Sequence, residues 1–474
     1  MKKRLTAVML SLCMMLMLFP TTAFAVEKYD LYLGYTQITS ENAGDVLGDG
    51  TISYDPDTCT LMLDNAKLPT GILTYGNDSK VLTINVIGNC EINKASGNGI
   101  SLQGKSTAGP VYHRDRLRIT GDGTLKISAM VGISAYDDVT VEDTNIEINT
   151  SNLAISVQNI NGDQRKGNLN IINSTVTATT NGSSTNVFWI ESGGIKIDNS
   201  TVIASAESSS NPALWAADFI EIIDKSHVEA TGGSSNTFYS DGDIVINDST
   251  VEATDTSEDA FPTIYAYGDI IVENGSNVTA ESKGMRGVFT DGNMTINDST
   301  VTSSGTTDEG MVVVGTLNVN NSKLTASSKP NDIIPAIVTE HLSITASDVT
   351  AHGGIQLYGY YNSYTENISF SITPAGGKLA EFKVDGNNWD GSAAVHFKEG
   401  EESPYNTTIN FGTDEMNWLG AYRYIHIGEH IHAGGTATCQ DKAVCEDCGR
   451  EYGDVDPDNH SFTNYVYNND ATCT

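Results

Sequence analysis

The stretch that decides the fold reads INDSTVEA, at residues 246–253. Seven variants of it lie between residues 171 and 351, including IINSTVTA (171–178), IDNSTVIA (197–204), INDSTVTS (296–303) and VNNSKLTA (319–326). All eight copies align on one serine, and these serines are spaced about 23–27 residues apart. A repeat of that length is typical of a solenoid in which each copy contributes one coil.

Apolar and polar residues alternate within the phrase. Counted from the serine, position −3 is apolar in seven copies and position +2 in all eight, whereas positions +1 and +3 are polar apart from Ile203. We assign Ile223 to position −3 of its copy, and a one-residue slip brings Val272 to that position in place of Glu273. Alternation with β-branched residues predicts half-buried strands. The Asn and Asp residues before the serine predict tight corners, because they tolerate left-handed backbone geometry.

A second apolar run precedes each copy, as in Leu214-Trp215 and Phe238-Tyr239. Each coil therefore has about three short strands joined by corners rich in Gly, Asn, Asp and Ser. Coils stacked about 4.8 Å apart would close one continuous core. The sequence predicts an all-β parallel β-helix, right-handed by the rule for parallel crossovers.

The flanking segments divide the chain further. Residues 1–25 have a charged start, an apolar run and a small-x-small site at Ala23-Phe24-Ala25, which predicts a secretion signal. We expect an N-terminal β cap at 26–75, the β-helix at 76–353, a C-terminal β cap or small domain at 354–428, and a Cys/His-rich module at 429–474. The sequence stops in the middle of a phrase, so we expect that it is truncated at Thr474.

The charge balance excludes some partners. The chain has 26 basic and 60 acidic residues, for a net charge of −34. Nucleic acids and anionic membrane surfaces both attract proteins through Lys and Arg, so neither is an expected partner. After residue 25 no stretch is long and apolar enough to span a bilayer. We expect a monomeric, exported protein at a bacterial cell surface.

One column of residues in the second apolar run is the candidate ligand-binding site. The alternation rule points it outward from the core. It comprises five aromatic residues, Trp189, Trp215, Tyr239, Tyr265 and Phe289, followed by Val312 and Ile337. Exposed rings on a stiff scaffold suit stacking on sugars, and contiguous apolar patches mark binding surfaces. Asp241 and Asp291 lie beside the column and are expected to accept sugar hydroxyls. Two alternatives remain: a loop or the C-terminal segment covers the stripe, or the rings face the core.

Two groups of residues suggest metals. Five acidic residues precede strands, and neighbouring coils could combine some of them into a Ca²⁺ site, although aspartate is common in turns anyway: Asp218, Asp241, Asp243, Asp269 and Asp291. In the C-terminal module, Cys439, Cys445 and Cys448 together with His460 would form a zinc site, with His432 as the alternative to His460. A Cys439–Cys448 disulfide is the other reading of this cluster.

Three parts of the chain resemble a known group of proteins. They are GDVLGDGTISYDPDTCTLMLDNA (44–66), the repeated coils, and HAGGTATCQDKAVCEDCGREYG (432–453). Together they resemble large exported right-handed β-helix surface proteins of clostridial gut bacteria, often described as carbohydrate-binding-domain-containing. The resemblance covers nearly the whole chain after residue 25. It implies a secreted or cell-surface location and contact with glycans.

These observations favour a glycan-binding or adhesion protein. One alternative is a polysaccharide lyase or glycoside hydrolase acting on an acidic polysaccharide. A hydrolase needs paired carboxylates at the scissile bond, and the NTD, DD, GHG and RIK motifs of polygalacturonases do not occur here as a set. Asp137-Asp138 is a lone pair. The other alternative is a structural stalk with neither activity. No catalytic residues are assigned.

Overall fold

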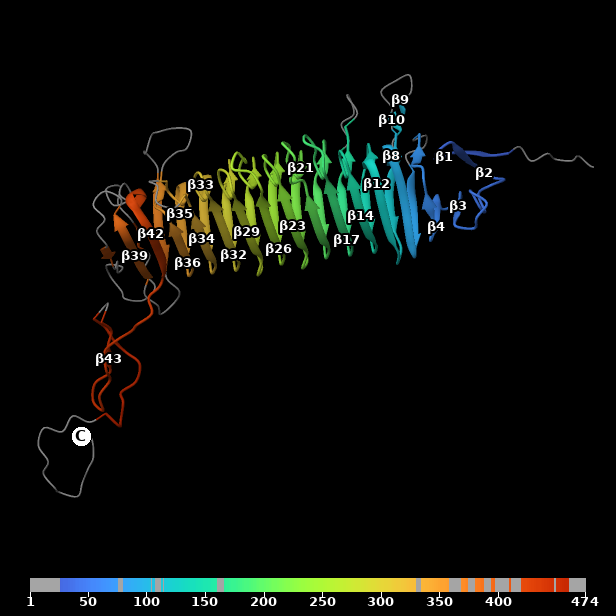
Figure 1. Cartoon of the computed structure of the whole chain (residues 1–474). Coiled ribbons are helices and arrows are strands. Elements are labelled where there is room, and N and C mark those ends of the chain that lie inside the picture. Colours follow the sequence, from blue (N-terminus) through green and yellow to red (C-terminus); the bar gives the residue numbers. More distant parts are fainter. Residues whose placement is uncertain are drawn as a thin grey trace, which may run out of the picture.

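The computed structural model describes residues 26–75, 80–103, 105–106, 112–113, 115–159, 166–329, 334–357, 368–373, 380–387, 394–396, 409–410, 419–446 and 449–459. The predicted signal at 1–25 lies outside them. Among the described residues there is one 3-10 turn, η1 (Leu419–Ala421), and no α-helix. The strands wind into a parallel solenoid of about 11 turns (Figure 1). The predicted all-β parallel β-helix is therefore confirmed.

Most coils contribute three strands, and in a few coils one long strand runs through two of the three positions. Each position pairs in parallel with its equivalent in the next coil, so three ladders run along the solenoid. The first ladder contains β4 (Thr60–Asp64), β7 (Val81–Ile87), β11 (Arg116–Thr120), β13 (Val139–Glu142), β16 (Leu169–Ile172), β19 (Ile195–Asp198), β22 (Phe219–Ile223), β25 (Asp243–Asn247), β28 (Ile270–Glu273), β31 (Met294–Asn297), β33 (Met311–Asn320), β35 (Ile337–Thr345) and β38 (Ser369–Thr373).

The second ladder follows the serine corner. It contains β5 (Lys67–Leu68), β8 (Asn89–Leu102), β12 (Thr124–Ala135), β14 (Asn145–Thr150), β17 (Thr175–Thr180), β20 (Thr201–Ser205), β23 (His227–Gly232), β26 (Thr250–Asp255), β29 (Asn277–Ser282), β32 (Thr300–Gly305), β34 (Lys323–Ser327) and β36 (Asp348–His352).

The strands that belong to the third ladder alone are each three residues long. Besides the ends of the long strands β8 and β12 and the starts of β33 and β35, it contains β6 (Ile72–Thr74), β15 (Ile155–Val157), β18 (Phe188–Ile190), β21 (Leu214–Ala216), β24 (Phe238–Ser240), β27 (Ile264–Ala266), β30 (Val288–Thr290) and β37 (Ile355–Leu357).

The core is built from the inward residues of all three ladders. In β25, for example, Ile244 and Ile246 are buried while Val245 faces outward. The register corrects one sequence assignment: Ile197 pairs with Ile222, so Ile222 occupies the core column and Ile223 does not. The displacement arises because this corner holds two left-handed residues, Asp224 and Lys225, where most corners hold one.

A hydrogen-bonded ladder of buried serines explains why the repeat carries serine. The Ser200 hydroxyl donates to the carbonyl of Asp198 (2.7 Å) and accepts the amide of Ser174 in the preceding coil (3.0 Å). The same acceptor bond recurs at each following coil up to the one from the Ser322 amide to Ser347. Each hydroxyl thus bonds one carbonyl of its own corner and one buried amide of the preceding coil, and buried backbone amides need such partners.

Asparagine and aspartate form a second, exposed ladder at the same corner. Asn173, Asn199 and Asn321 have positive φ angles of 47°, 44° and 48°, as do the aspartates at equivalent corners. The side chains bond from coil to coil, for instance from the Asn199 amide to the Asn173 oxygen at 2.8 Å. This is the structural role that residues tolerant of left-handed geometry are expected to play.

The solenoid is longer than the sequence boundaries at 76 and 353 suggested. Parallel pairing begins at β4, and β38 still pairs in parallel with β35. At the N-terminal end, β1 (Lys28–Leu33) pairs antiparallel with β2 (Thr36–Thr39) and with β6, and β3 (Ile52–Asp55) pairs antiparallel with β4. The antiparallel pairs protect the first coil from the edge-to-edge association that an open sheet invites.

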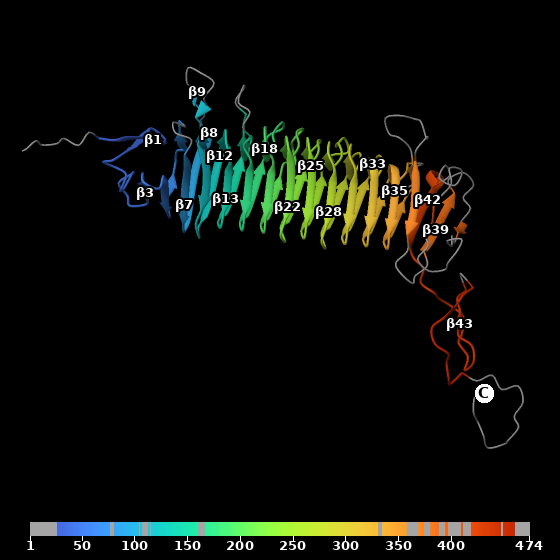
Figure 2. The same cartoon turned by 180° about the vertical axis from the view of Figure 1, so that it is seen from behind.

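The other end is closed by β42 (Tyr422–Glu429), which pairs antiparallel with β36 and with β39 (Ala380–Asn387). β40 (Ala394–His396) and β41 (Ile409–Asn410) extend this cap. A small hairpin, β9 (Lys105–Ser106) with β10 (Tyr112–His113), stands apart from the ladders. After β42 the chain leaves the solenoid and forms a second hairpin, β43 (Ala443–Val444) with β44 (Glu451–Tyr452) (Figure 2).

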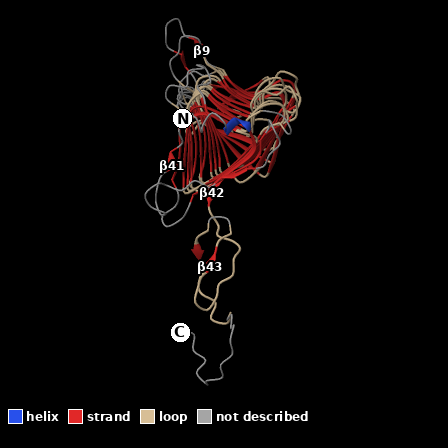
Figure 3. Cartoon of the chain, turned by 90° about the vertical axis from the view of Figure 1, so that its left-hand side faces the viewer, coloured by secondary structure: helices blue, strands red, loops and turns tan. Residues whose placement is uncertain are grey.

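Seen along its axis, the solenoid shows its strands stacked behind one another and its loops gathered at the corners (Figure 3). In the part of the chain that is described, no helix has the length and apolar character that a membrane crossing would require.

Candidate functional site

Five aromatic residues occupy one outward column of the third ladder. The register pairs Trp189 with Trp215, Trp215 with Tyr239, Tyr239 with Tyr265, and Tyr265 with Phe289. Each is the central residue of a three-residue strand whose other two residues are buried in the core. Because side chains alternate along a strand, the five rings lie on the outside of the solenoid core.

The rings form one continuous series of contacts. The Trp189 and Trp215 centroids are 6.1 Å apart, and the Trp215 and Tyr239 rings stack at 6.5 Å. Tyr265 stands edge-on to both Tyr239 and Phe289 at 5.2 Å. Tyr267 adds a sixth ring, with centroids 6.0 Å from Tyr239 and 5.0 Å from Tyr265. Offset and edge-to-face contacts of this kind hold aromatic groups in defined orientations.

The column is exposed unevenly along its length. Trp189, Trp215, Tyr239 and Tyr265 are half-buried, whereas Phe289 is only 7% exposed. Phe289 packs with Val312 and Val338 in a small cluster separate from the main core. The register places Val338, not Ile337, in this column, and Ile337 belongs to the main core. Among the described residues, a covered stripe is therefore found at the Phe289 end only.

The loops that connect the second ladder to the third lie beside the rings and form one side of a groove, which we call the wall. Their asparagines link neighbouring coils, since the Asn186 and Asn236 side-chain amides donate to the carbonyls of Pro212 and Pro262 at 2.6 Å each. Phe261 is 57% exposed on this wall, and Tyr267 is 50% exposed beside the ring column. Wall and rings enclose a groove of about 860 Å³. Its lining is Asn152, Leu153, Ser184, Asn186, Trp189, Asn211, Pro212, Trp215, Ser235, Asn236, Tyr239, Phe261, Pro262, Tyr265, Tyr267, Met285, Arg286 and Phe289.

The two aspartates that we expected to contact a ligand bond tyrosine hydroxyls of the column. Tyr265 donates to Asp291 at 2.7 Å, and Asp241 bonds the Tyr239 hydroxyl. Neither aspartate lines the groove. Burial, and secondly a side-chain hydrogen bond, raises the pKa of both tyrosines above the ordinary value of 10.0, so both phenols remain protonated donors at neutral pH.

Arg286 is the one charged residue in the lining. Its guanidinium lies 5.5 Å from the centre of the Phe289 ring and pairs with Asp308 (2.9 Å) and Glu309 (2.8 Å). Burial raises the pKa of Glu309, and a hydrogen bond between its carboxyl and that of Asp308 adds to this effect. Since carboxylates behind it compensate the cation, the groove presents a nearly neutral surface on a very acidic protein.

The acidic residues considered for calcium have local partners. Asp243 accepts the amide of Asp269 (2.8 Å), and Asp269 in turn accepts the amide of Asn293 (2.7 Å), so both cap corners. Asp218 pairs with Lys166 at 2.7 Å. Among the described residues, the one cluster of three or more potential metal ligands lies elsewhere, in the C-terminal module. Calcium binding stays a prediction.

The structure describes only some of the predicted zinc ligands, and it places one of these in a ligand cluster. Cys448 and His460 lie outside the described residues. Cys439 is a free, partly exposed thiol and is not part of the ligand cluster. Cys445 does belong to that cluster, but its neighbours are His430 and His432.

Sequence reasoning missed the wall of the groove. Phe261, Pro262 and Met285 lie in loops that carry no strand periodicity. One signal was available: a proline precedes the third strand in both NPALW (211–215) and FPTIY (261–265), where a rigid residue positions the loop against the column.

Comparison with known proteins finds no matching family model, no matching curated protein and no matching solved structure. The function is therefore inferred from the groove itself.

Proposed function

We propose that the aromatic groove binds a neutral, linear polysaccharide, and that the protein acts as an exported glycan-binding or adhesion protein. The observation that carries this proposal is the unbroken series of rings from Trp189 to Tyr265, open along one side of the solenoid and walled by amide and hydroxyl groups. Rings offer flat apolar faces to the C–H faces of sugars, and the asparagine and serine side chains offer hydrogen bonds to sugar hydroxyls.

The dimensions suit several sugar units. Four steps between coils, of about 4.8 Å each, spread the column from Trp189 to Phe289 over about 19 Å. The volume of about 860 Å³ is within the range of specific ligand sites. Because the coils repeat, the groove offers similar contacts at each step, which matches a polymer with a repeating unit better than a compact small molecule.

Charge favours a neutral ligand over an acidic one. The chain carries a net charge of −34, and the only cation in the lining is paired with two carboxylates. A polyuronate would meet repulsion over the whole surface and find no unpaired cation in the groove to offset it. An acidic polysaccharide is therefore the weaker candidate.

The lining also favours binding over cleavage. A glycoside hydrolase places two carboxylates at the scissile bond. The eighteen lining residues, all of them described, include no Asp or Glu.

The test is binding of the full chain to immobilised neutral and acidic polysaccharides, with and without Ca²⁺. We expect saturable binding to at least one neutral polymer. The double substitution Trp215→Ala/Tyr265→Ala should weaken it at least tenfold, or about 1.4 kcal/mol. Tyr35→Ala is the matched control, because Tyr35 is a fully exposed aromatic residue in the β1–β2 turn, outside the groove lining.

Three results would count against the proposal: no binding to any neutral polymer, binding that survives in the double variant, or preference for a polyuronate. Release of reducing ends would replace it with the enzyme alternative. Binding that depends on Ca²⁺ would indicate a calcium site among the corner aspartates. Circular dichroism of each variant separates a lost ligand from a lost fold.

A further inference from the structure

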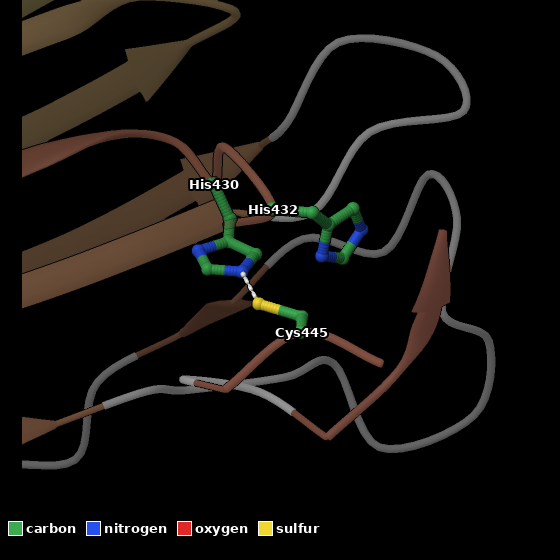
Figure 4. Close-up of side chains that lie close together, drawn as sticks. All are labelled: His430, His432 and Cys445. Atoms are coloured by element: carbon green, nitrogen blue, oxygen red, sulfur yellow. Dashed lines mark hydrogen bonds between the residues drawn. The ribbon is translucent and has the colours of Figure 1, made fainter. Parts of the chain in front are cut away.

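Two histidines and a cysteine converge where the C-terminal module leaves the solenoid. His430, His432 and Cys445 each offer one ligating atom, and the three atoms lie within 4.8 Å of one another (Figure 4). The Cys445 sulfur is 3.5 Å from Nε2 of His430. His430 is 5% exposed and Cys445 is 1% exposed, while His432 is half-buried and stacks on Tyr452 with centroids 5.4 Å apart.

The backbone holds these groups together from two directions. His430 follows directly on β42, the strand that closes the solenoid. Cys445 follows β43, and its backbone bonds the far side of the hairpin: its amide donates to Arg450 (2.8 Å) and its carbonyl accepts the Gly449 amide (2.9 Å). The Glu446 amide donates to Ala433 at 3.0 Å, which ties the hairpin to the segment that carries the two histidines.

The separation between the Cys445 sulfur and His430 fits a tetrahedral metal, and the third ligand atom lies within 4.8 Å of these two. Zinc binds histidine nitrogen at about 2.0–2.1 Å and thiolate sulfur at about 2.3 Å, so tetrahedral geometry separates the two ligand atoms by about 3.6 Å. The observed 3.5 Å between sulfur and Nε2 agrees with that value. Imidazole and thiolate are also the ligand types that zinc prefers among protein side chains.

In the described part of the module, few buried residues contribute to stability. Its strands are two residues long, and its buried residues among those described are His430, Ala443 and Cys445. These three residues do not make an apolar core, and small units of this kind usually need a metal or disulfides as a staple. No disulfide links the cysteines that are described.

We propose that His430, His432 and Cys445 bind one zinc ion, which fixes the C-terminal module to the closing strand of the solenoid. This ligand set differs from the set expected from the sequence, because it draws on the two histidines after β42 and leaves out Cys439. The described residues supply three ligands. Water would complete a tetrahedral set as the fourth ligand.

The experiment uses the full chain, reduced and freed of metal with a chelator. Zinc is then added, and its stoichiometry is measured by elemental analysis and its affinity by competition with a chromophoric chelator. We expect one ion per chain, and at least tenfold weaker binding in each of His430→Asn, His432→Asn and Cys445→Ser. Cobalt in place of zinc should give a thiolate-to-metal charge-transfer band that Cys445→Ser removes.

Cys439→Ser is the discriminating control and should bind zinc like the unmodified chain. Metal should also slow proteolysis between residues 431 and 442, a readout independent of stoichiometry. The proposal fails if the chain binds no metal, in which case sulfur and imidazole form only a hydrogen bond. It fails equally if Cys439→Ser abolishes binding while His430→Asn leaves it intact. The thermal unfolding of the solenoid, followed in parallel, shows whether a variant has merely failed to fold.

Discussion

At the scale of single residues, the buried serine of each repeat does the most for the fold. Its hydroxyl satisfies a carbonyl of its own corner and the amide of the equivalent serine one coil earlier, so consecutive coils are joined by side chains as well as by strand pairing. The column of serines is visible in the sequence, because the copies of the repeat align on this residue. The reason for serine became clear only from the structure, since the bond runs between residues about 23–27 positions apart.

Ser249→Ala tests this role. The Ser249 hydroxyl is buried, donates to Asn247 (2.8 Å) and accepts the Ser226 amide (3.2 Å). Alanine removes the bond to the Asn247 carbonyl and leaves the buried Ser226 amide without this acceptor, which costs about 1–3 kcal/mol. We expect a correspondingly lower denaturation midpoint in urea. Ser208→Ala is the control, because Ser208 is an exposed loop residue and its loss should change stability by less than about 0.5 kcal/mol. Equal effects of the two variants would contradict the ladder.

Asp255 gives a pH-dependent prediction. Burial raises the pKa of this carboxyl above 3.8, against the hydrogen bonds from Thr263 and Lys283 that lower it. A raised pKa in the folded state means that the folded protein holds the proton more tightly. The contribution of Asp255 to stability is thus full below the unfolded pKa and is lost as the pH rises through the folded value.

We therefore expect Asp255→Asn to gain stability relative to the unmodified chain as the pH is raised from below 3.8 towards neutrality. The comparison is made by urea denaturation at a series of pH values. Asp259→Asn, a change at a nearby exposed carboxylate, should show no such trend. A gap between Asp255→Asn and the unmodified chain that stays constant across the series would refute the assignment.

At the scale of elements, the corners decide the register. Most corners hold one left-handed residue, but those before Ser226 and Ser276 hold two, at 224–225 and 274–275. The extra residue shifts the preceding strand by one position. We recognised this slip at Val272, where Glu273 made it visible, and missed it at Ile222, because its neighbour Ile223 is also apolar. Alternation of apolar residues cannot resolve a register where two isoleucines are adjacent.

Asn199 shows what a corner residue contributes. Its φ angle is 44°, and its side-chain amide donates to Asn173 at 2.8 Å. Asn199→Ala loses the bond and must hold a left-handed conformation that costs about 1–2 kcal/mol in L-residues without a compensating side chain. Asn199→Gly loses the bond but adopts the angle freely. Urea denaturation should rank the unmodified chain first, the glycine variant second and the alanine variant last; an alanine variant as stable as the glycine variant would refute this account.

The sequence predicted one side of the groove, the column of rings, but not the other. Period-two alternation was enough to place the five rings in one outward column, since that rule depends only on strand geometry. Three features depend on how loops from successive coils lie against each other. They are the wall of the groove, the burial of Phe289 and the hydrogen bond from Tyr265 to Asp291. Loop conformation has no periodicity, so the sequence pattern did not predict these three features.

At the scale of the whole molecule, the protein is a rod of stacked coils with antiparallel caps. The repeat predicted this architecture because every coil must bury its apolar face against its neighbours. The ends were less predictable: the parallel ladders extend to β4 and β38, where the repeated phrase has already faded. In the resulting molecule, a nearly neutral aromatic groove lies partway along a strongly acidic rod, and we propose that this contrast selects a neutral polymer.

The most direct measurement is a fluorescence titration of the full chain with neutral polysaccharides. Two of the four tryptophans, Trp189 and Trp215, lie in the groove and would report a sugar stacked on them. The account predicts a saturable change in tryptophan emission with a neutral polymer, no change with polygalacturonate, and loss of the change in Trp189→Phe/Trp215→Phe. An emission change of equal size with polygalacturonate, or one that persists in the double variant, would contradict the claim that this groove is the binding site.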